Sequence, residues 1–99
     1  MRIFSKSTLT SFWRTHADSE QPLKVWFKLC SNADWSEPSE ISDLFSGISL
    51  LKDQRVCFNI KGNDYRLIAK VNYEYKSVFV LFIGSHAEYD KIDANTYTP

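Results

Sequence analysis

A group of polar side chains in the second half of the chain has the residue types that can cut a phosphodiester bond without a metal. Arg66 supplies fixed cationic donors for a phosphate, and His86 can move a proton near neutral pH. Tyr89 can donate a hydrogen bond and also stack on a nucleobase. In such a reaction a base takes the 2′-hydroxyl proton, cations stabilise the pentacovalent phosphorane, and an acid protonates the leaving 5′-oxygen. Arg66, His86 and Tyr89 are therefore the candidate catalytic residues.

The surrounding sequence predicts that these side chains meet at one end of a β-sheet. Asn59 and Lys61 alternate onto the same face of a strand that ends in a Gly-Asn turn at residues 62–63. Arg66 lies just past this turn on the next strand, and Lys70 follows on the same face. The candidate histidine and tyrosine directly follow the third strand of the series.

Each of these residues also has a purely structural interpretation. Arg66 and Lys70 fit solvated charges on the surface of a strand. Lys61 beside the turn fits a residue that keeps a hairpin soluble. His86 stands where it can cap the turn that follows it, and Asp90 is a surface carboxylate unless it orients His86.

Other kinds of site are disfavoured because their motifs are missing. The chain contains no GxxxxGK[ST], GxGxxG or GxSxG, and three glycines are few for a phosphate-cradling loop. The two histidines and two cysteines do not have the spacing of metal ligands. Cys30 and Cys57 lie in apolar patterns, so we expect two buried free thiols. The sequence therefore predicts no metal and no cofactor.

Composition predicts a folded chain that has no bulk attraction for nucleic acid. Its 99 residues suffice for a single domain over residues 1–99, and its 43% hydrophobic and 15% aromatic content favours a packed core. Twelve basic and twelve acidic residues cancel, so any nucleic-acid site must be a local basic patch. With no export signal and no membrane-spanning run, we expect a cytoplasmic protein.

The first half of the chain is predicted to hold a short strand over residues 1–5 and two helices. We expect Ser7 to cap the first helix, whose apolar face has the spacing i, i+3, i+4, i+7 at Leu9, Phe12, Trp13 and His16. The histidine of this face is expected to be partly buried and structural. Ser19 or Asp18 is expected to cap the second helix, which repeats the spacing at Leu23, Trp26, Phe27 and Cys30. Residues 31–47 fit a loop with one helical turn.

From residue 51 onward the apolar pattern changes to a period of two. Residues 55–61 and 64–73 alternate in the manner of strands with one buried face. Residues 77–84 are apolar on both faces, which favours a central strand covered on both sides. A polar turn follows, and residues 93–99 are expected to be frayed. Helices followed by a run of antiparallel strands predict an α+β fold.

Four stretches of the sequence carry a resemblance to a known family. They are VCFNIKGNDYRL at residues 56–67, FIGSHAEYDKID at 82–93, MRIFSKSTLTSFW at the N-terminus, and SNADW after the second predicted helix. The chain resembles the HigB-type toxins of the RelE-like superfamily over nearly its whole length. The patterns FN-x-x-GN-x-x-R and H-x-EYD are the specific part of this likeness. Ser85 stands where the family more usually has threonine, and Lys61 occupies a variable position.

The resemblance implies a fold, an activity and partners. The fold would be a small twisted, mostly antiparallel sheet of about four strands with two N-terminal helices packed on one face. The activity would be ribosome-dependent, metal-independent cleavage of mRNA. A HigA-type helix-turn-helix antitoxin would neutralise it, with operator DNA bound only through that antitoxin and no membrane involved. The residues expected to contact RNA are Asn59, Lys61, Asn63, Lys70 and Lys91.

A second functional class stays open at this point. A homologue that has lost catalysis would act only as a module that binds an antitoxin or a ribosomal site. The zero net charge favours this alternative, because small ribonuclease toxins are often basic.

Overall fold

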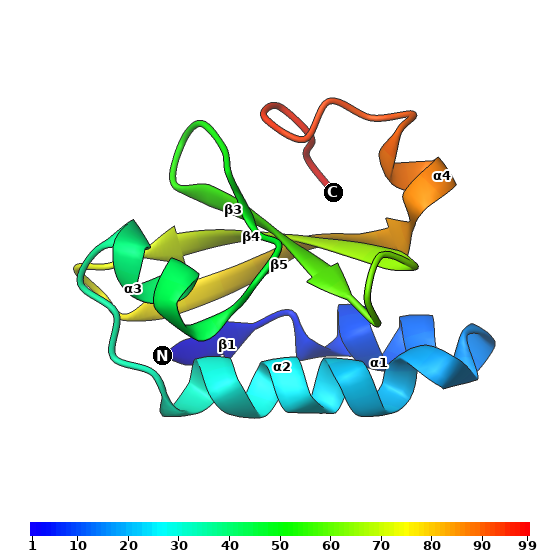
Figure 1. Ribbon diagram of the computed structural model, residues 1–99, viewed down its shortest axis with the longest axis horizontal. Helices are drawn as coiled ribbons and strands as arrows, with labels where there is room; N and C mark the ends of the chain where they lie inside the picture. The colour runs from blue at the N-terminus through cyan, green and yellow to red at the C-terminus, as the bar shows by residue number, and fades with distance from the viewer.

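A computed structural model describes residues 1–99 as one sheet with two long helices on one side (Figure 1). The strands are β1 (Arg2–Phe4), β2 (Ser49–Leu50), β3 (Arg55–Ile60), β4 (Tyr65–Asn72) and β5 (Ser77–Ser85). The helices are α1 (Lys6–Thr15), the 3₁₀ turn η1 (Ala17–Ser19), α2 (Glu20–Asn32), α3 (Pro38–Leu44) and α4 (His86–Tyr89). This confirms the α+β class and the two N-terminal helices on one face. None of the helices combines the length and the apolar content that a membrane-spanning helix requires.

The sheet has five strands in the order β1-β5-β4-β3-β2, and every neighbouring pair is antiparallel except β1 with β5. The sheet is therefore mostly antiparallel, as expected, with one strand more than the expected four or so. The additional strand β2 has only two residues, which is too short to show any alternation in the sequence. The register between β4 and β5 shifts at Ile68/Ala69.

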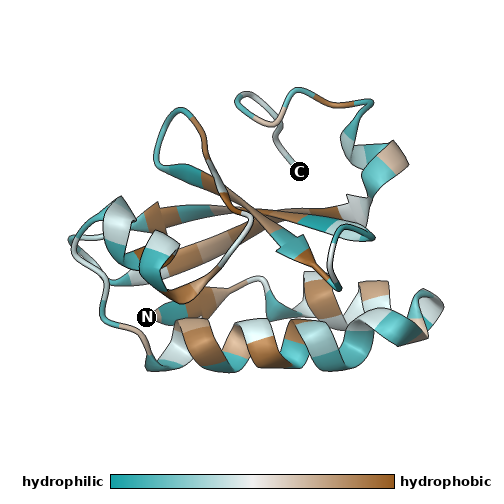
Figure 2. Cartoon of the chain, in the orientation of Figure 1, coloured by the Kyte–Doolittle hydropathy of each residue, from teal (hydrophilic) through white to brown (hydrophobic).

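One face of the sheet and the inner sides of α1 and α2 form the hydrophobic core. Alternate side chains of the two middle strands, Val56, Phe58 and Ile60 on β3 and Leu67, Ala69 and Val71 on β4, all belong to it. Leu9, Leu23 and Trp26 enter it from the helices. Figure 2 shows the hydrophobic residues of α2 and of the strands alternating with hydrophilic ones. Burying each large side chain of this kind contributes about 1.5–3 kcal/mol. The core therefore holds helices α1 and α2 on the sheet.

The helix starts differ from the expected ones. Helix α1 begins at Lys6, with Ser5 in a left-handed conformation (φ 69°) before it, so Ser7 lies inside the first turn and is not the cap. Helix α2 follows Ser19, but no side chain caps it. The Ser19 hydroxyl donates to the His16 carbonyl, and Asp18 turns toward the sheet. Helix α3 extends past the single expected turn because Pro38 and a Glu37–Glu40 capping box support its start.

Strand β5 is central, but only part of it is covered on both sides. Val78 and Val80 are buried against the helices, whereas Phe79 on the other face is 39% exposed.

The C-terminal segment covers the far end of this face and is not frayed. The buried Arg55 guanidinium donates to the carbonyls of Ala94 and Tyr97, and the Tyr97 ring packs on Phe82. A buried cation needs hydrogen-bond acceptors, and the tail supplies them.

Two further expectations are confirmed. Cys30 and Cys57 are buried free thiols. His16 is partly buried and structural, because its ring stacks on Phe12 at 4.0 Å and contacts the edge of Tyr65 at 5.7 Å between ring centroids.

Candidate functional site

The candidate site lies on the open face of the sheet, which is the face away from α1 and α2. Asn59 on β3 is the direct partner of Arg66 on β4, and Arg66 is in turn opposite Gly84 on β5. Neighbours of Asn59 and Arg66 along each strand point into the core, so strand alternation places these two side chains on the open face. Tyr89 reaches the same place from α4.

The guanidinium of Arg66 is held on two sides. Its Nη1 donates a hydrogen bond to the Asn59 side-chain oxygen, and its Cζ lies 5.5 Å from the centre of the Tyr89 ring. Its Nε is buried with no hydrogen-bond partner. Asn59 and Tyr89 therefore fix the guanidinium in position, and a fixed guanidinium suits binding of a phosphate.

Tyr89 and Cys57 lie next to each other and next to this guanidinium. Burial and the neighbouring Cys57 thiol raise the pKa of Tyr89 to about 12, so the phenol is protonated at neutral pH. Burial also raises the pKa of Cys57, which keeps this thiol neutral as well. The sequence predicted Cys57 only as a buried thiol and not as part of the site; the period-two alternation, which puts Cys57 and Asn59 on one strand face, was the available signal.

Two glycines allow the close packing around these side chains. A Cβ on Gly84 would lie 2.6 Å from the Phe82 ring and 3.3 Å from the Glu88 Cβ. A Cβ on Gly47 would lie 2.7 Å from the Asn59 amide nitrogen, and Gly47 also has a left-handed φ of +68°. Neither glycine was expected to border the site. The contact of Gly47 with Asn59 joins residues far apart in the sequence, which a local pattern does not reveal.

His86 is the first residue of α4, at the end of β5. Its Nδ1 lies 3.0 Å from an Asp90 carboxylate oxygen, and 46% of its side chain is exposed. Ser85, and not His86, caps the helix, through a capping box with Glu88. The interpretation of His86 as the cap is therefore wrong. Of the three candidate catalytic residues, Tyr89 contacts Arg66, whereas His86 makes its side-chain contact with Asp90.

Lys61 does not join Asn59 on the open face. Strand β3 ends at Ile60, and Lys61 has a φ of 53°, so the alternation stops one residue before it. Its ammonium instead pairs with Asp18 at 2.8 Å and with Asp64 at 3.4 Å. The expectation that Asn59 and Lys61 share a face is therefore wrong, because the left-handed residue turns the chain toward η1.

The other residues that were expected to contact RNA are Lys70, Asn63 and Lys91. Lys70 is on the open face four residues along β4, with its ammonium 3.0 Å from an Asp53 oxygen. Asn63 is exposed in the turn between β3 and β4, and Lys91 is exposed after α4. Hydrogen bonds from Ser85 lower the pKa of Glu88, and the charges of His16 and Lys91 lower it further.

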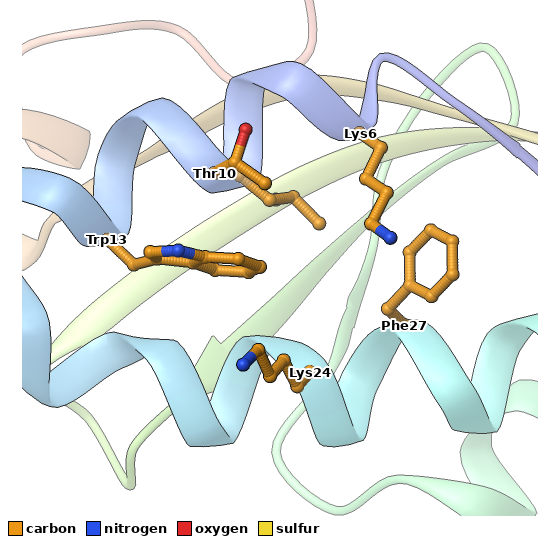
Figure 3. Close-up of a pocket in the computed structure, with 6 residues that line it drawn as sticks. Lys6, Thr10, Trp13, Lys24 and Phe27 are labelled. Carbon is orange, nitrogen blue, oxygen red and sulfur yellow. The ribbon is translucent and has the colours of Figure 1, made fainter.

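A cavity of about 160 Å³ lies elsewhere, between α1 and α2. Figure 3 shows Trp13 and Phe27 facing this space, with Lys6 and Lys24 beside them. The Lys6 ammonium lies 4.6 Å from the Phe27 ring centre, and the Lys24 ammonium lies 5.5 Å from that of Trp13. None of the candidate site residues lines this cavity. No three His, Cys, Asp or Glu side chains are grouped closely enough to hold a metal ion.

Comparisons with known proteins agree on one family. Residues 19–92 match the HigB toxin family, described as the RelE-like toxic component of a toxin–antitoxin system. The chain is also similar to the mRNA interferase HigB of Escherichia coli O6:H1 (strain CFT073). The two are 30% identical over 94 residues, which cover 93% of this chain and 91% of that protein.

Proposed function

This chain belongs to the HigB family of RelE-like toxins from toxin–antitoxin systems, and we propose from that membership that it is an endoribonuclease that cleaves messenger RNA. The observation that carries the proposal is the grouping of Asn59, Arg66 and Tyr89 on the open face of the sheet. A fixed guanidinium beside a neutral phenol suits recognition of a phosphate with its adjoining base.

The proposed reaction is transfer of the phosphate to the neighbouring 2′-oxygen. A base takes the 2′-hydroxyl proton and the 2′-oxygen bonds to phosphorus. The bond from phosphorus to the 5′-oxygen breaks as an acid protonates that oxygen. Arg66 would stabilise the negative charge of the phosphorane. The exposed His86 imidazole, held by Asp90, would take or deliver one of the protons. Tyr89, with its raised pKa of about 12, would act as a donor or stacking group and not as a base.

We further propose that the chain acts on mRNA presented by the ribosome. The zero net charge gives no general attraction for RNA. Lys61, one of the expected cationic contacts, is paired with the carboxylates of Asp18 and Asp64. A chain of this kind would rely on the ribosome to bring the substrate to the site. The neutralising partner would be a HigA-type helix-turn-helix antitoxin, which would also carry the contact with operator DNA.

The test is induced expression in bacteria, followed by mapping of mRNA 5′ ends. The wild-type chain is expected to arrest growth and produce new 5′ ends, and Arg66→Ala is expected to do neither. Arg14→Ala removes an exposed arginine from the end of α1 and serves as the matched control, with activity unchanged. Cleavage of purified mRNA with and without added ribosomes tests ribosome dependence. Full toxicity of Arg66→Ala would refute the site.

The zero net charge also supports a second candidate function, a module that binds an antitoxin or the ribosome and has no catalytic activity. Such a protein would arrest growth by occupancy, if at all, and would leave the pattern of mRNA 5′ ends unchanged. The mapping experiment therefore separates the two functions directly.

A further inference from the structure

The open face of the sheet carries aromatic rings that the hydrophobic core does not use. These rings are Phe4, Phe79, Phe82, Tyr89 and Tyr97, and none of them is fully buried. The core on the other face takes buried rings such as Trp26 and Phe58. In Figure 1 the C-terminal segment lies on the open side of the sheet, where Tyr97 packs on Phe82. Partly exposed aromatic rings therefore lie on this face from the Arg66 site to strand β1.

Phe4 and Phe79 form a stacked pair at the far end of these rings. They are direct partners on the parallel strands β1 and β5. Their ring centroids lie 4.7 Å apart and their planes differ by 10°. Phe79 is 39% exposed, which is unusual for a large apolar residue on a central strand. Because the two rings stack face to face and the Arg2 guanidinium lies over Phe4, the ring surface left for a further group belongs to Phe79.

Cations border this pair on two sides. The Arg2 guanidinium lies 5.0 Å from the centre of the Phe4 ring. Lys70 is the direct partner of Phe79 on β4 and shares the open face with Arg66. Asp53, which binds Lys70, is the acidic residue that contacts this group. Aromatic rings interleaved with cations are the elements that hold single-stranded nucleic acid.

We propose that Phe4 and Phe79, with Arg2 and Lys70, are a second RNA-binding site, on which a base of the single-stranded substrate stacks. The proposal rests on the proposed function and extends it, because it names where RNA beyond the cleaved bond is bound. Arg66 and Lys70 are four residues apart on β4, or about 13 Å along the strand. That separation places the platform a few nucleotides from the cleaved bond. A protein partner is disfavoured because the exposed apolar surface is small and its borders are cationic.

The test uses a short single-stranded RNA oligonucleotide with 2′-O-methyl groups, which the protein cannot cleave. Phe79→Leu and Phe4→Leu keep apolar bulk and remove the stacking ring. The double variant is expected to bind the oligonucleotide about 5- to 100-fold more weakly than the wild type. Phe79→Tyr keeps a ring and is expected to bind as the wild type does. Phe27→Leu is the matched control, because Phe27 is a partly exposed ring beneath a lysine on the helix side.

Cleavage of ribosome-bound mRNA is measured on the same proteins, so that the platform and the proposed function are judged separately. Weaker binding with a raised KM and a nearly unchanged kcat supports the platform. A wild type that binds RNA through Phe79 but cleaves nothing would refute the function and retain the platform. The platform is overturned if the leucine variants bind the oligonucleotide as tightly as the wild type does, or if their KM for ribosome-bound mRNA is unchanged. Loss of antitoxin binding without loss of RNA binding would overturn it too, and would identify a protein interface.

Discussion

The side-chain oxygen of Asn59 accepts a hydrogen bond from the guanidinium of Arg66, its direct partner across the β3–β4 ladder. Both side chains stand on the open face of the sheet, and the Tyr89 ring lies against the other side of the guanidinium. The pairing is local in space but depends on the register set by the turn at residues 61–64. A slip of one residue would point Arg66 into the core. The hairpin therefore orients the group proposed to contact the phosphate.

The first prediction concerns this hydrogen bond. Asn59→Ala is expected to lower the rate of mRNA cleavage by about 10- to 100-fold, because a hydrogen bond to a charged group contributes about 1.5–3 kcal/mol. The loss should appear in kcat/KM for ribosome-bound mRNA, with little change in the midpoint of thermal unfolding. Asn32→Ala, at the exposed end of α2, is the control. A fully active Asn59→Ala variant would show that Arg66 needs no such support.

The second prediction separates His86 from the carboxylate that holds it. His86→Ala is expected to lower the single-turnover cleavage rate by about 10²- to 10⁴-fold, the usual contribution of a general acid or base. Asp90→Asn is expected to cost less, about tenfold, because Asp90 contacts the ring and not the reacting atoms. His16→Gln changes the other histidine, which is structural, and should reduce stability without reducing the rate per folded molecule. Wild-type rates in His86→Ala would remove this residue from the mechanism.

Local alternation predicted most of the sheet, because alternate apolar side chains of β3 and β4 enter the core between the sheet and the helices. The predicted faces of residues 56–60 and 65–71 agree with the observed core. The same reasoning failed at Lys61, where a left-handed residue ends the alternation. The sequence pattern was extended one residue too far, and the error moved a lysine from the ion pair with Asp18 to the candidate site.

Features that depend on distant parts of the chain could not be predicted from local patterns. The acceptors of the Arg55 guanidinium are carbonyls of Ala94 and Tyr97, which lie 39 and 42 residues further along the chain. The packing of Gly47 on Asn59 is similarly long-range. The grouping of Asn59, Arg66 and Tyr89 was partly predicted, because strand parity placed the first two. The contact between Tyr89 and Arg66 depends on the direction of α4, which no pattern in the sequence specifies.

The third prediction concerns acid stability. Hydrogen bonds from Lys61 and from Tyr65 hold the pKa of Asp18 below its ordinary value of 3.8. Because the folded state then binds fewer protons than the unfolded state, this contribution is complete above that value and is lost as the pH falls through the lowered pKa. Urea denaturation from pH 7 down to about 3 should show the advantage of the wild type over Asp18→Asn shrinking with acidity. Asp43→Asn, at an exposed carboxylate without an ion pair, should show no such convergence, and a constant difference for Asp18→Asn would contradict the prediction.

The last prediction concerns the C-terminal segment, whose carbonyls accept hydrogen bonds from the buried Arg55 guanidinium. Removal of residues 94–99 is expected to lower the free energy of unfolding by about 3 kcal/mol, because it removes both acceptors of the Arg55 guanidinium and a hydrogen bond to a charged group contributes about 1.5–3 kcal/mol. Removal of the exposed residues 98–99 alone should have no measurable effect. Arg55→Met removes the cation, so the same truncation should destabilise an Arg55→Met chain much less, and urea denaturation of the four proteins measures this coupling. An equal cost in both backgrounds would show that the segment stabilises the fold through its packing on Phe82 and not through Arg55.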